Sequence, residues 1–285
     1  MALISMCVYD TGVNQRAPLV KRTLESLLKT VDFARHRIIL VVNASTEESA
    51  EHIADFLKQA GKKSDAIWLP ENVGTARGIN RAWLTRQEGE HAVKMDDDVV
   101  IYSPGWVDEM EEAISRDPRI GIIGLKRKDL LETPDAEEPR FRSTLQMLPH
   151  QAGQRWVVVE QVEHVMGTCQ MFNAALLEKI GFFYQPGLYG FDDSLAAVRC
   201  RVAGFYNCFI PHYEIDHIDD GQTPYQEWKV KYAWQDMAEY NRLKDGYLSG
   251  KIPIWYGPNG EQDAQPAAPA QAASIGWAIP NLSTR

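Results

Sequence analysis

The sequence has no apolar run long enough to cross a membrane. Its 285 residues contain only short apolar stretches, well below the roughly 20 residues that a transmembrane helix needs. The apolar start, MALISMCVYD, carries no positive charge and reaches an acid at Asp10, so it lacks the pattern of a signal peptide. A synthase that extrudes its product through its own membrane spans is therefore disfavoured, and we expect a cytoplasmic protein.

Paired cysteines and an excess of positive charge are also missing. The four cysteines form no CxxC pair and have no metal-ligand spacing, which favours free thiols in a reducing compartment. The net charge of -9 is unlike that of proteins that bind nucleic acid non-specifically. A local basic run at 126–128, with Arg140 and Arg142 nearby, leaves binding to DNA open.

Short apolar runs alternate with helical patterns in the first half of the chain. Strands are predicted over 3–9, 37–42, 66–69, 91–95 and 120–125, and helices over 18–29, 47–60, 75–86 and 104–116. This alternation predicts an α/β fold with a mostly parallel central sheet flanked by helices. Ligands bind beyond the carboxyl ends of the strands in such sheets. We therefore expect the residues that follow these strands to face one crevice: Asp10, Asn43, Asn72, Asp96, Asp97 and Asp98.

The second half has a less regular pattern. Strands are predicted over 156–162 and 208–211, helices over 174–180, 192–203 and 225–243, and an exposed loop over 126–142. We expect one domain made of two halves, 1–125 and 126–256. The segment 257–285 is rich in Ala and Pro and has few periodic apolar residues, which predicts a flexible tail.

The first segment with chemical character is KMDDDV, a buried strand that ends in Asp96, Asp97 and Asp98. Like charges at this density are costly unless a cation neutralises them. Carboxylate oxygens suit Mg²⁺ or Mn²⁺, and such sites leave positions for substrate phosphates. The alternative is a solvated acidic turn, but the place of the cluster at a strand end favours a metal site.

A second segment, PENVGTARGINRAW, joins a strand to a helix. Asn72 and Gly74 lie in the turn, Thr75 has the chemistry of an N-cap, and Arg77 and Asn80 fall in the first helical turns. Free N–H groups and the positive end of the helix dipole attract a diphosphate there. The alternative is a plain strand-to-helix loop.

A third segment contains a glycine-bearing loop with Gly167 and Thr168, and then a Gly-rich stretch that leads to Asp192 and Asp193. One acid at a helix start can cap the helix. Two adjacent acids there also suit a general base. His217 ends a later strand-like segment, where a structural role and a metal-binding role both remain open.

Taken in order, these segments resemble family 2 of the GT-A glycosyltransferases over residues 3–217. The run NVGTARGIN is similar to the family's N-x-G-x-x-x-A-x-N, with Gly78 in place of the usual Ala. KMDDDV looks like the DxD element. GFDDSLAAVRCRVAGF resembles the family's E-D-x-x-L-x-x-R-x-x-x-x-G segment, with Asp192 in place of the Glu.

The resemblance implies a GT-A, Rossmann-like fold in which 1–125 bind a nucleotide sugar and 126–256 bind the acceptor and carry the catalytic residues. It implies transfer from a UDP-sugar to an acceptor hydroxyl with inversion, assisted by Mn²⁺ or Mg²⁺. Asp193 would be the catalytic base with Asp192 beside it, and Asp96, Asp98 and His217 would hold the metal. The residues implied in donor binding are Tyr9, Asp10, Asn43, Asn72, Gly74, Arg77, Asn80, Asp96, Asp97, Gly167 and Thr168.

Several alternatives stay open from the sequence. The acceptor is a glycan or other small molecule, or a hydroxymethylated base of phage DNA. A sugar nucleotidyltransferase and a non-catalytic nucleotide-sugar-binding module are rival functions, although the Gly-rich basic loop that the former needs is not visible after the first strand. Asn43 replaces a commoner acid, which leaves the nucleobase open. Trp228, Trp234 and Tyr240 could stack on a sugar or base, or pack in the core.

Overall fold

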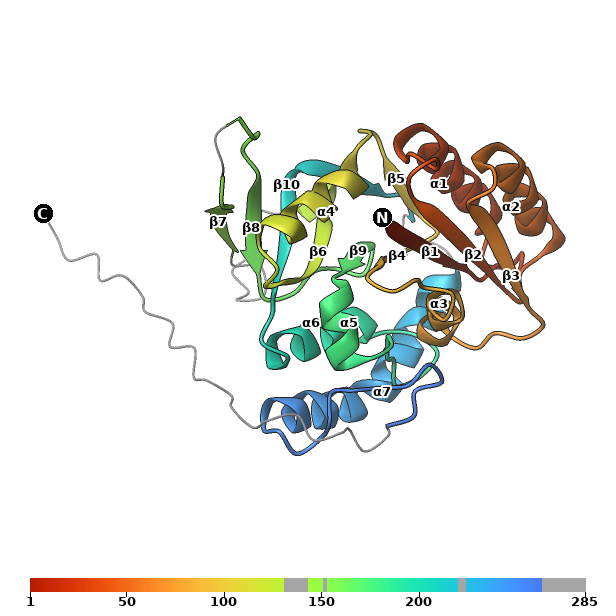
Figure 1. The fold of residues 1–285 in the computed structure, drawn as a ribbon. Coiled ribbons are helices and arrows are strands. Elements are labelled where there is room, and N and C mark those ends of the chain that lie inside the picture. Colours follow the sequence, from red (N-terminus) through yellow and green to blue (C-terminus); the bar gives the residue numbers. More distant parts are fainter. Residues whose placement is uncertain (131–142, 151–152, 220–223, 263–285) are drawn as a thin grey trace, which may run out of the picture.

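A single ten-stranded sheet runs through the computed structural model, which describes residues 1–130, 143–150, 153–219 and 224–262 (Figure 1). The strand order is β3-β2-β1-β4-β9-β6-β10-β8-β7, and β5 pairs with β10. The strands are β1 (Ala2–Val8), β2 (Arg37–Asn43), β3 (Ser64–Leu69), β4 (His91–Met95), β5 (Val99–Ile101), β6 (Ile120–Arg127), β7 (Ser143–Met147), β8 (Val158–Val162), β9 (Cys169–Phe172) and β10 (Tyr206–His217). Only β5, β8 and β9 run against the common direction of the described strands, so the predicted mostly parallel sheet is confirmed.

Helices cover both faces of this sheet. They are α1 (Ala17–Thr30), α2 (Glu47–Ala60), α3 (Thr75–Trp83), α4 (Trp106–Arg116), α5 (Ala174–Ile180), α6 (Asp192–Val202) and α7 (Pro224–Leu248), with a 3₁₀ turn at Lys128–Leu130. In Figure 1, α1, α2 and α4 lie above the sheet, and α3, α5, α6 and α7 lie below it. The result is a three-layer α/β fold.

The alternation of side chains along the central strands explains the two cores. Successive residues of a strand point to opposite faces, so Ile4, Met6 and Val8 of β1 join the core beneath α1, α2 and α4. Leu3, whose side chain points to the opposite face, joins the second core, which packs against α3, α5 and α6. Because both faces are covered, these strands read as continuous apolar runs rather than as alternating ones.

Helix boundaries follow local capping chemistry. The Thr46 side chain accepts a hydrogen bond from the Ser49 N–H at the start of α2, and Gly61, with φ of 84°, ends it. Asn173 caps α5 in the same way through the Ala175 N–H, and Gly181 ends it with φ of 70°. These signals are readable in the sequence, and the predicted helices 47–60 and 174–180 match the structure.

The structure differs from the sequence prediction at several strands. β5, β7 and β9 were not predicted, and β9 lies where a loop was expected. β10 extends over Tyr206–His217 rather than 208–211, which makes His217 the last residue of that strand. The predicted loop 126–142 begins as the end of β6, and 131–142 lie outside the described residues.

Most of the predicted tail, 263–285, also lies outside the described residues. Its start is packed against α3, since the Asn80 side-chain N–H donates to the Pro258 carbonyl at 3.0 Å. Within the described chain, none of the helices combines the length and the apolar character needed to cross a bilayer.

Candidate active site

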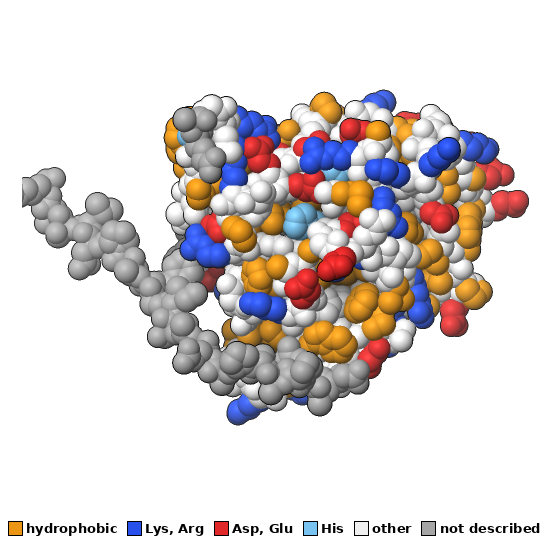
Figure 2. Space-filling model, viewed as in Figure 1, with side chains coloured by type: hydrophobic (Ala, Val, Ile, Leu, Met, Phe, Trp, Pro, Cys, Tyr) orange, Lys and Arg blue, Asp and Glu red, His pale blue; other side chains and the backbone are white. Residues whose placement is uncertain are grey.

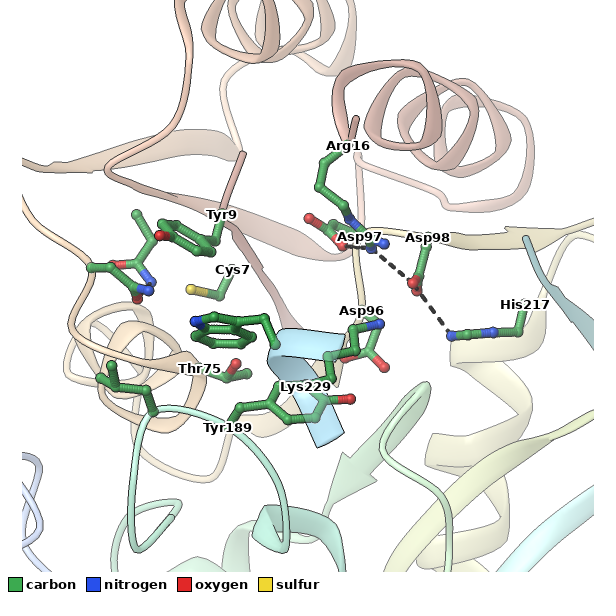
Figure 3. Close-up of a pocket in the computed structure, with 14 residues that line it drawn as sticks. Cys7, Tyr9, Arg16, Thr75, Asp96, Asp97, Asp98, Tyr189, His217 and Lys229 are labelled. Atoms are coloured by element: carbon green, nitrogen blue, oxygen red, sulfur yellow. Dashed lines mark hydrogen bonds and ion pairs between the residues drawn. The ribbon is translucent and has the colours of Figure 1, made fainter. Parts of the chain in front are cut away.

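A small cavity opens where β1, β2 and β4 end (Figure 3). Its volume is about 80 Å³, and Cys7, Tyr9, Arg16, Asn43, Asn72, Thr75, Asp96, Asp97, Asp98, Leu188, Tyr189, His217, Trp228 and Lys229 line it. The structure thus brings five of the six expected crevice residues together. The exception is Asp10, which does not line this cavity. This cavity is called the first cavity below.

Arg16 is the main partner of the acidic cluster in the first cavity. Its guanidinium contacts the Asp97 carboxylate, lies 2.7 Å from Asp98 Oδ2 and donates to Asp219 Oδ2 at 2.9 Å (Figure 3). Lys229 of α7 contacts the same Asp219 oxygen at 2.8 Å. The chain therefore supplies its own cations for much of the charge that the sequence left for a metal to neutralise.

Asp98 retains an oxygen that these cations do not occupy. Its Oδ1 is buried and has no hydrogen-bond partner in the described chain, while Oδ2 lies 3.3 Å from His217 Nε2. Burial opposes ionisation of Asp98, but His217, Arg16 and Lys229 more than offset it and hold its pKa well below the usual range. An ionised carboxylate with an open oxygen beside an imidazole is a donor set that suits a divalent cation.

Asp96 is engaged differently from Asp98. Lys94 Nζ lies 2.5 Å from Asp96 Oδ1 and also donates to the Gly167 carbonyl at 2.6 Å. Burial opposes the charge on Lys94, but Asp96 and Asp192 outweigh it and raise the pKa of Lys94. Asp96 is thus bound to an internal ammonium group and does not close a three-ligand cluster with Asp98 and His217.

The one compact His/Asp/Glu triad in the described residues lies elsewhere. His36, Asp108 and Glu111 place ligand atoms within 4.8 Å of one another, beside the amino end of β2 and thus at the opposite end of the strands from the first cavity. Arg35 already pairs with Asp108 at 2.6 Å and with Glu111 at 3.1 Å. This triad is therefore a structural ion-pair cluster.

A second, larger cavity adjoins the first. Its volume is about 570 Å³, within the range usual for small-molecule sites. The residues that line both cavities are Thr75, Asp96, Tyr189, His217 and Lys229. Asp192, Asp193, Gly167 and Thr168 line the second cavity only, and Asp98 lines the first only. The expected base and the expected metal ligand Asp98 therefore lie on either side of a shared wall that Asp96 and His217 help to form.

A strained turn delivers the two acids to the second cavity. Gly190 has φ of 91° and Phe191 has φ of 63°, a left-handed conformation that costs a residue with a side chain of order 1 kcal/mol or more. The Phe191 ring stacks on Tyr240 of α7 at 4.4 Å, which helps to hold this conformation. α6 then starts directly at Asp192, so both acids lie in its first turn.

The environments of Asp192 and Asp193 push their pKa values apart. Burial, together with the charges of Asp193 and Asp96, raises the pKa of Asp192 to about 6 against the opposing effect of Lys94. Burial also opposes ionisation of Asp193, but His164, Lys94 and the Gly167 N–H lower its pKa well below the usual range. Gly167 N donates to Asp193 Oδ2 at 3.0 Å. Asp193 is therefore the more acidic member of the pair and the one that stays ionised as the pH falls.

Two residues expected to bind the donor, Asp10 and Asn80, form hydrogen bonds within the protein instead. The Asp10 carboxylate accepts hydrogen bonds from Gly12 N, Thr46 Oγ1 and Ser49 Oγ at 2.9, 2.5 and 2.7 Å, and only 1% of the residue is exposed. Asn80 is bound to the backbone of Phe183 in both directions.

The structure places two residues of the turn at 72–77 differently from the sequence expectation. Arg77 is exposed and lines a separate small cavity rather than either of the two described above. Gly74, not Thr75, is the N-cap of α3, and it makes no side-chain cap. With φ of 83°, and with its absent Cβ position 3.2 Å from Leu188 Cα, this site requires glycine.

Asn43 lines the first cavity, but its side-chain amide is hydrogen-bonded to the turn at 72–73. Its Nδ2 donates to Asn72 Oδ1 at 2.8 Å, and its Oδ1 accepts from Val73 N at 3.0 Å. Only 1% of Asn43 is exposed. The side chain therefore shapes the turn that carries Asn72.

Helix α7 closes the first cavity with Trp228 and Lys229. The Trp228 ring lies 6.2 Å from Tyr9 and 5.8 Å from Tyr189, centroid to centroid. The other two aromatic residues of the late helix lie elsewhere: Trp234 is 69% exposed, and Tyr240 packs on Phe191. Arg16, Lys94, His164 and Lys229 are site residues that the sequence analysis missed. Lys94 had a readable signal, a charge inside an apolar strand.

The family model for glycosyl transferase family 2 matches residues 5–181. This chain belongs to glycosyl transferase family 2. The match includes β9, α5 and the first-cavity residues from Cys7 to Asp98. It stops before the Asp192–Asp193 pair and before the first-cavity residues Leu188, Tyr189, His217, Trp228 and Lys229. A curated relative, the uncharacterized protein y4gI of Sinorhizobium fredii, is 23% identical over 75% of this chain, which spans only 24% of that protein's length.

Solved glycosyltransferase structures share the fold at low identity. The mannosyltransferase PcManGT of Pyrobaculum calidifontis, in complex with GDP-Man and Mn²⁺, has a TM-score of 0.61 and 17% identity over 81% of this chain and 60% of its own. S. aureus TarS (1–349) has a TM-score of 0.56 and 14% identity, over 87% of this chain and 71% of its own. GalNAc-T7, with UDP, GalNAc and Mn²⁺, has a TM-score of 0.53 and 13% identity over 77% and 44%. The fold is therefore that of the GT-A glycosyltransferases.

Proposed function

We propose that this family 2 glycosyltransferase moves a sugar from a nucleoside-diphosphate sugar to an acceptor hydroxyl with inversion at the anomeric carbon. The observation that carries the proposal is the shared wall of the two cavities, formed in part by Asp96 and His217. A donor whose diphosphate lies against that wall directs its sugar toward the second cavity. Asp193 lines that cavity and is ionised at neutral pH because of its neighbours.

In this proposal Asp193 is the general base. It takes the proton from the acceptor hydroxyl as that oxygen bonds to the anomeric carbon, and the bond from that carbon to the diphosphate oxygen breaks with its electron pair going to the diphosphate. A single displacement of this kind needs one base and inverts the configuration. Proton acceptance by a positioned carboxylate contributes about 10²–10⁴-fold in rate.

Asp98 and His217 would hold a divalent cation, Mn²⁺ or Mg²⁺. The fit rests on the buried Asp98 Oδ1, which lacks a hydrogen-bond partner in the described chain, and on His217 Nε2, which lies 3.3 Å from the other carboxylate oxygen. When bound, such a cation supplies positive charge to a departing diphosphate. Arg16 and Lys229 hold Asp219 and orient the acids around this position. The Mn²⁺ in two of the similar structures supports the same assignment.

We propose a UDP-sugar as donor, and TarS in complex with UDP-GlcNAc or UDP supports this choice. GDP-Man in the archaeal mannosyltransferase makes GDP-sugars the main alternative. The first cavity, at about 80 Å³, is smaller than the 300–1,000 Å³ usual for ligand sites. A nucleoside therefore requires the cavity to widen, and a movement of Trp228, which lines it, would do this.

For the acceptor, we propose a glycan or other hydroxylated small molecule rather than a modified DNA base. The basic run is largely neutralised, since Lys126 lies 2.8 Å from Glu160 and Arg127 pairs with Asp129. Figure 2 shows Lys and Arg side chains interspersed with Asp and Glu on this face of the described chain. DNA-binding surfaces gather basic side chains in one patch.

The test is Asp193→Asn, which keeps the shape of the side chain and removes its charge. Release of UDP from UDP-GlcNAc, and of GDP from GDP-Man, should fall at least 100-fold, while donor affinity should change little. Asp55→Asn, an exposed α2 position paired with Lys58, is the matched control and should turn over at the parental rate.

Two results would contradict the proposal. An Asp193→Asn protein that is folded and turns over at the parental rate would remove Asp193 as the base. Metal-dependent nucleotide binding by the parental protein without any turnover, with sugar and small-glycan acceptors supplied, would favour the non-catalytic module instead.

A further inference from the structure

The loop between β8 and β9 brings an imidazole to the base. His164 Nε2 lies 3.2 Å from Asp193 Oδ2, and Gly167 of the same loop donates its N–H to that oxygen at 3.0 Å. The other oxygen, Oδ1, accepts from the Ser194 N–H at 2.7 Å. One loop thus supplies two of the groups that fix the Asp193 carboxylate.

Two features distinguish this contact from an ordinary structural ion pair. The His164 and Asp193 side chains are 19% and 22% exposed, and both face the second cavity. The internal ammonium group of the site is committed to other oxygens, because Lys94 binds Asp96 at 2.5 Å and lies 3.9 Å from Asp192. The two neighbouring acids of α6 therefore have different nearest partners, Lys94 for Asp192 and His164 for Asp193, and His164 and Asp193 both line the second cavity.

We propose that His164 is a positioning residue for the transfer reaction: it holds the Asp193 carboxylate in a fixed orientation and in its charged form while the acceptor hydroxyl approaches. This inference rests on the proposed role of Asp193 as base. The imidazole Nε2 lies 3.2 Å from Oδ2, and each carboxylate oxygen has two lone pairs, so the carboxylate keeps lone pairs free for the acceptor proton.

The electrostatic consequence has a definite sign. The charge and hydrogen bond of His164 are the largest effects that favour the ionised form of Asp193, acting against its burial, and they lower its pKa. Lys94 acts in the same direction on Asp193, whereas Asp193 and Asp96 oppose the ionisation of the neighbouring Asp192. The other charged groups lining the same cavity are Arg127, His217, Asp219 and Lys229. Removal of the imidazole should therefore raise the pKa of Asp193.

The test compares His164→Ala and His164→Gln with the parental enzyme. With UDP-GlcNAc or GDP-Man as donor, the acidic limb of kcat/KM should move to higher pH in His164→Ala by about one unit, which is a tenfold loss on that limb. His164→Gln retains an N–H donor and should recover part of the rate. The KM for the donor should stay within about twofold of the parental value, because His164 does not line the first cavity.

A second measurement does not depend on turnover. The Asp193 carboxyl, followed by ¹³C NMR, should titrate at higher pH in His164→Ala than in the parental protein. His212→Ala is the control, since His212 is half-exposed and pairs with Glu109, away from both cavities. It should change neither the limb nor the titration.

The outcomes separate the two proposals. If the parental protein turns over donor but His164→Ala leaves both the pH limb and the Asp193 titration unchanged, the positioning role is wrong and the proposed function stands. If the parental protein has no turnover with any donor, the proposed function fails. In that case a shifted Asp193 titration would still establish the pairing, and an unchanged one would overturn it.

Discussion

A glycine in α3 makes room for a sulfur atom in β1, and this contact predicts a measurable coupling. A Cβ added at Gly78 would lie 2.4 Å from Cys7 Sγ, closer than real Cβ contacts allow. The Cys7 backbone is held by its pairing with Val41 of β2 in a buried parallel ladder, so only a rotation of the thiol could relieve the contact. The contact also gives a physical reason for Gly78 in place of the alanine of the family motif that this segment resembles.

The magnitude follows from two opposing effects. Alanine is about 1 kcal/mol more favourable than glycine inside a helix, whereas overpacking a closely packed interior costs about 1–3 kcal/mol. The sulfur contact is severe and the strand is fixed, so we expect Gly78→Ala to lower the free energy of unfolding by about 2 kcal/mol. For a chain of this size, that corresponds to a fall in Tm of roughly 4–8 °C.

The assay is urea and thermal unfolding of a double-mutant cycle with Cys7→Ala. Once the sulfur is absent, the nearest remaining contacts of the new Cβ are Cys7 Cβ at 3.5 Å and Val41 Cγ1 at 3.7 Å, which are ordinary. Gly78→Ala should then stabilise by about 1 kcal/mol, giving a coupling energy near 3 kcal/mol. Equal effects of Gly78→Ala in both backgrounds would refute the reasoning.

Three further predictions concern stability and binding. Hydrogen bonds lower the pKa of Asp10 against its burial, and Arg119 followed by Tyr206 lowers that of Asp117. The folded-state pKa values of both carboxyls lie below the usual 3.8. The stability that the two ionised carboxylates contribute is therefore present above about pH 4 and is lost as the pH falls further. Asp117→Asn should make the free energy of urea unfolding depend less on pH in that acidic range. Arg199→Lys should cost about 3 kcal/mol, because buried Arg199 donates to the carbonyls of Ile180, Phe182 and Ile254. Trp228→Ala should weaken nucleotide binding, as measured by calorimetry, because the indole ring can stack on the base. An unchanged affinity would exclude a stacking role for Trp228.

The parallel half of the fold was predictable because its signals are local. The apolar runs of β1, β2 and β4, and the caps at Thr46 and Asn173, lie within a few residues of the elements that they define. β9 was missed because its pairing is not local: it inserts between β4 and β6, far away in sequence, and its four residues have no alternating pattern. β5 is only three residues long.

The sequence was sufficient to predict the acidic residues of the site but not the residues that contact them. A strand that ends in three acids and a helix that starts with two are readable patterns. Arg16 reaches Asp97 across 81 positions, and His164 reaches Asp193 from another loop. Only the fold brings such residues together, so no local pattern marks them. The same reason explains Asn80 and Asp10, whose motif positions suggested ligand contacts and whose side chains bind backbone and hydroxyl groups instead.

The central claim is that Asp98 and His217 of the first cavity hold a divalent cation together with a nucleotide sugar. The most direct test is a thermal-shift titration of UDP, UDP-GlcNAc, GDP and GDP-Man, each with Mn²⁺, Mg²⁺ or chelator, on the parental protein, Asp98→Asn and the control Asp55→Asn. A ligand at 100 times its Kd should stabilise the fold by about 2.7 kcal/mol. The account predicts a shift that needs both nucleotide and cation, that survives in Asp55→Asn and that disappears in Asp98→Asn. A parental protein that no nucleotide stabilises with any cation would contradict it.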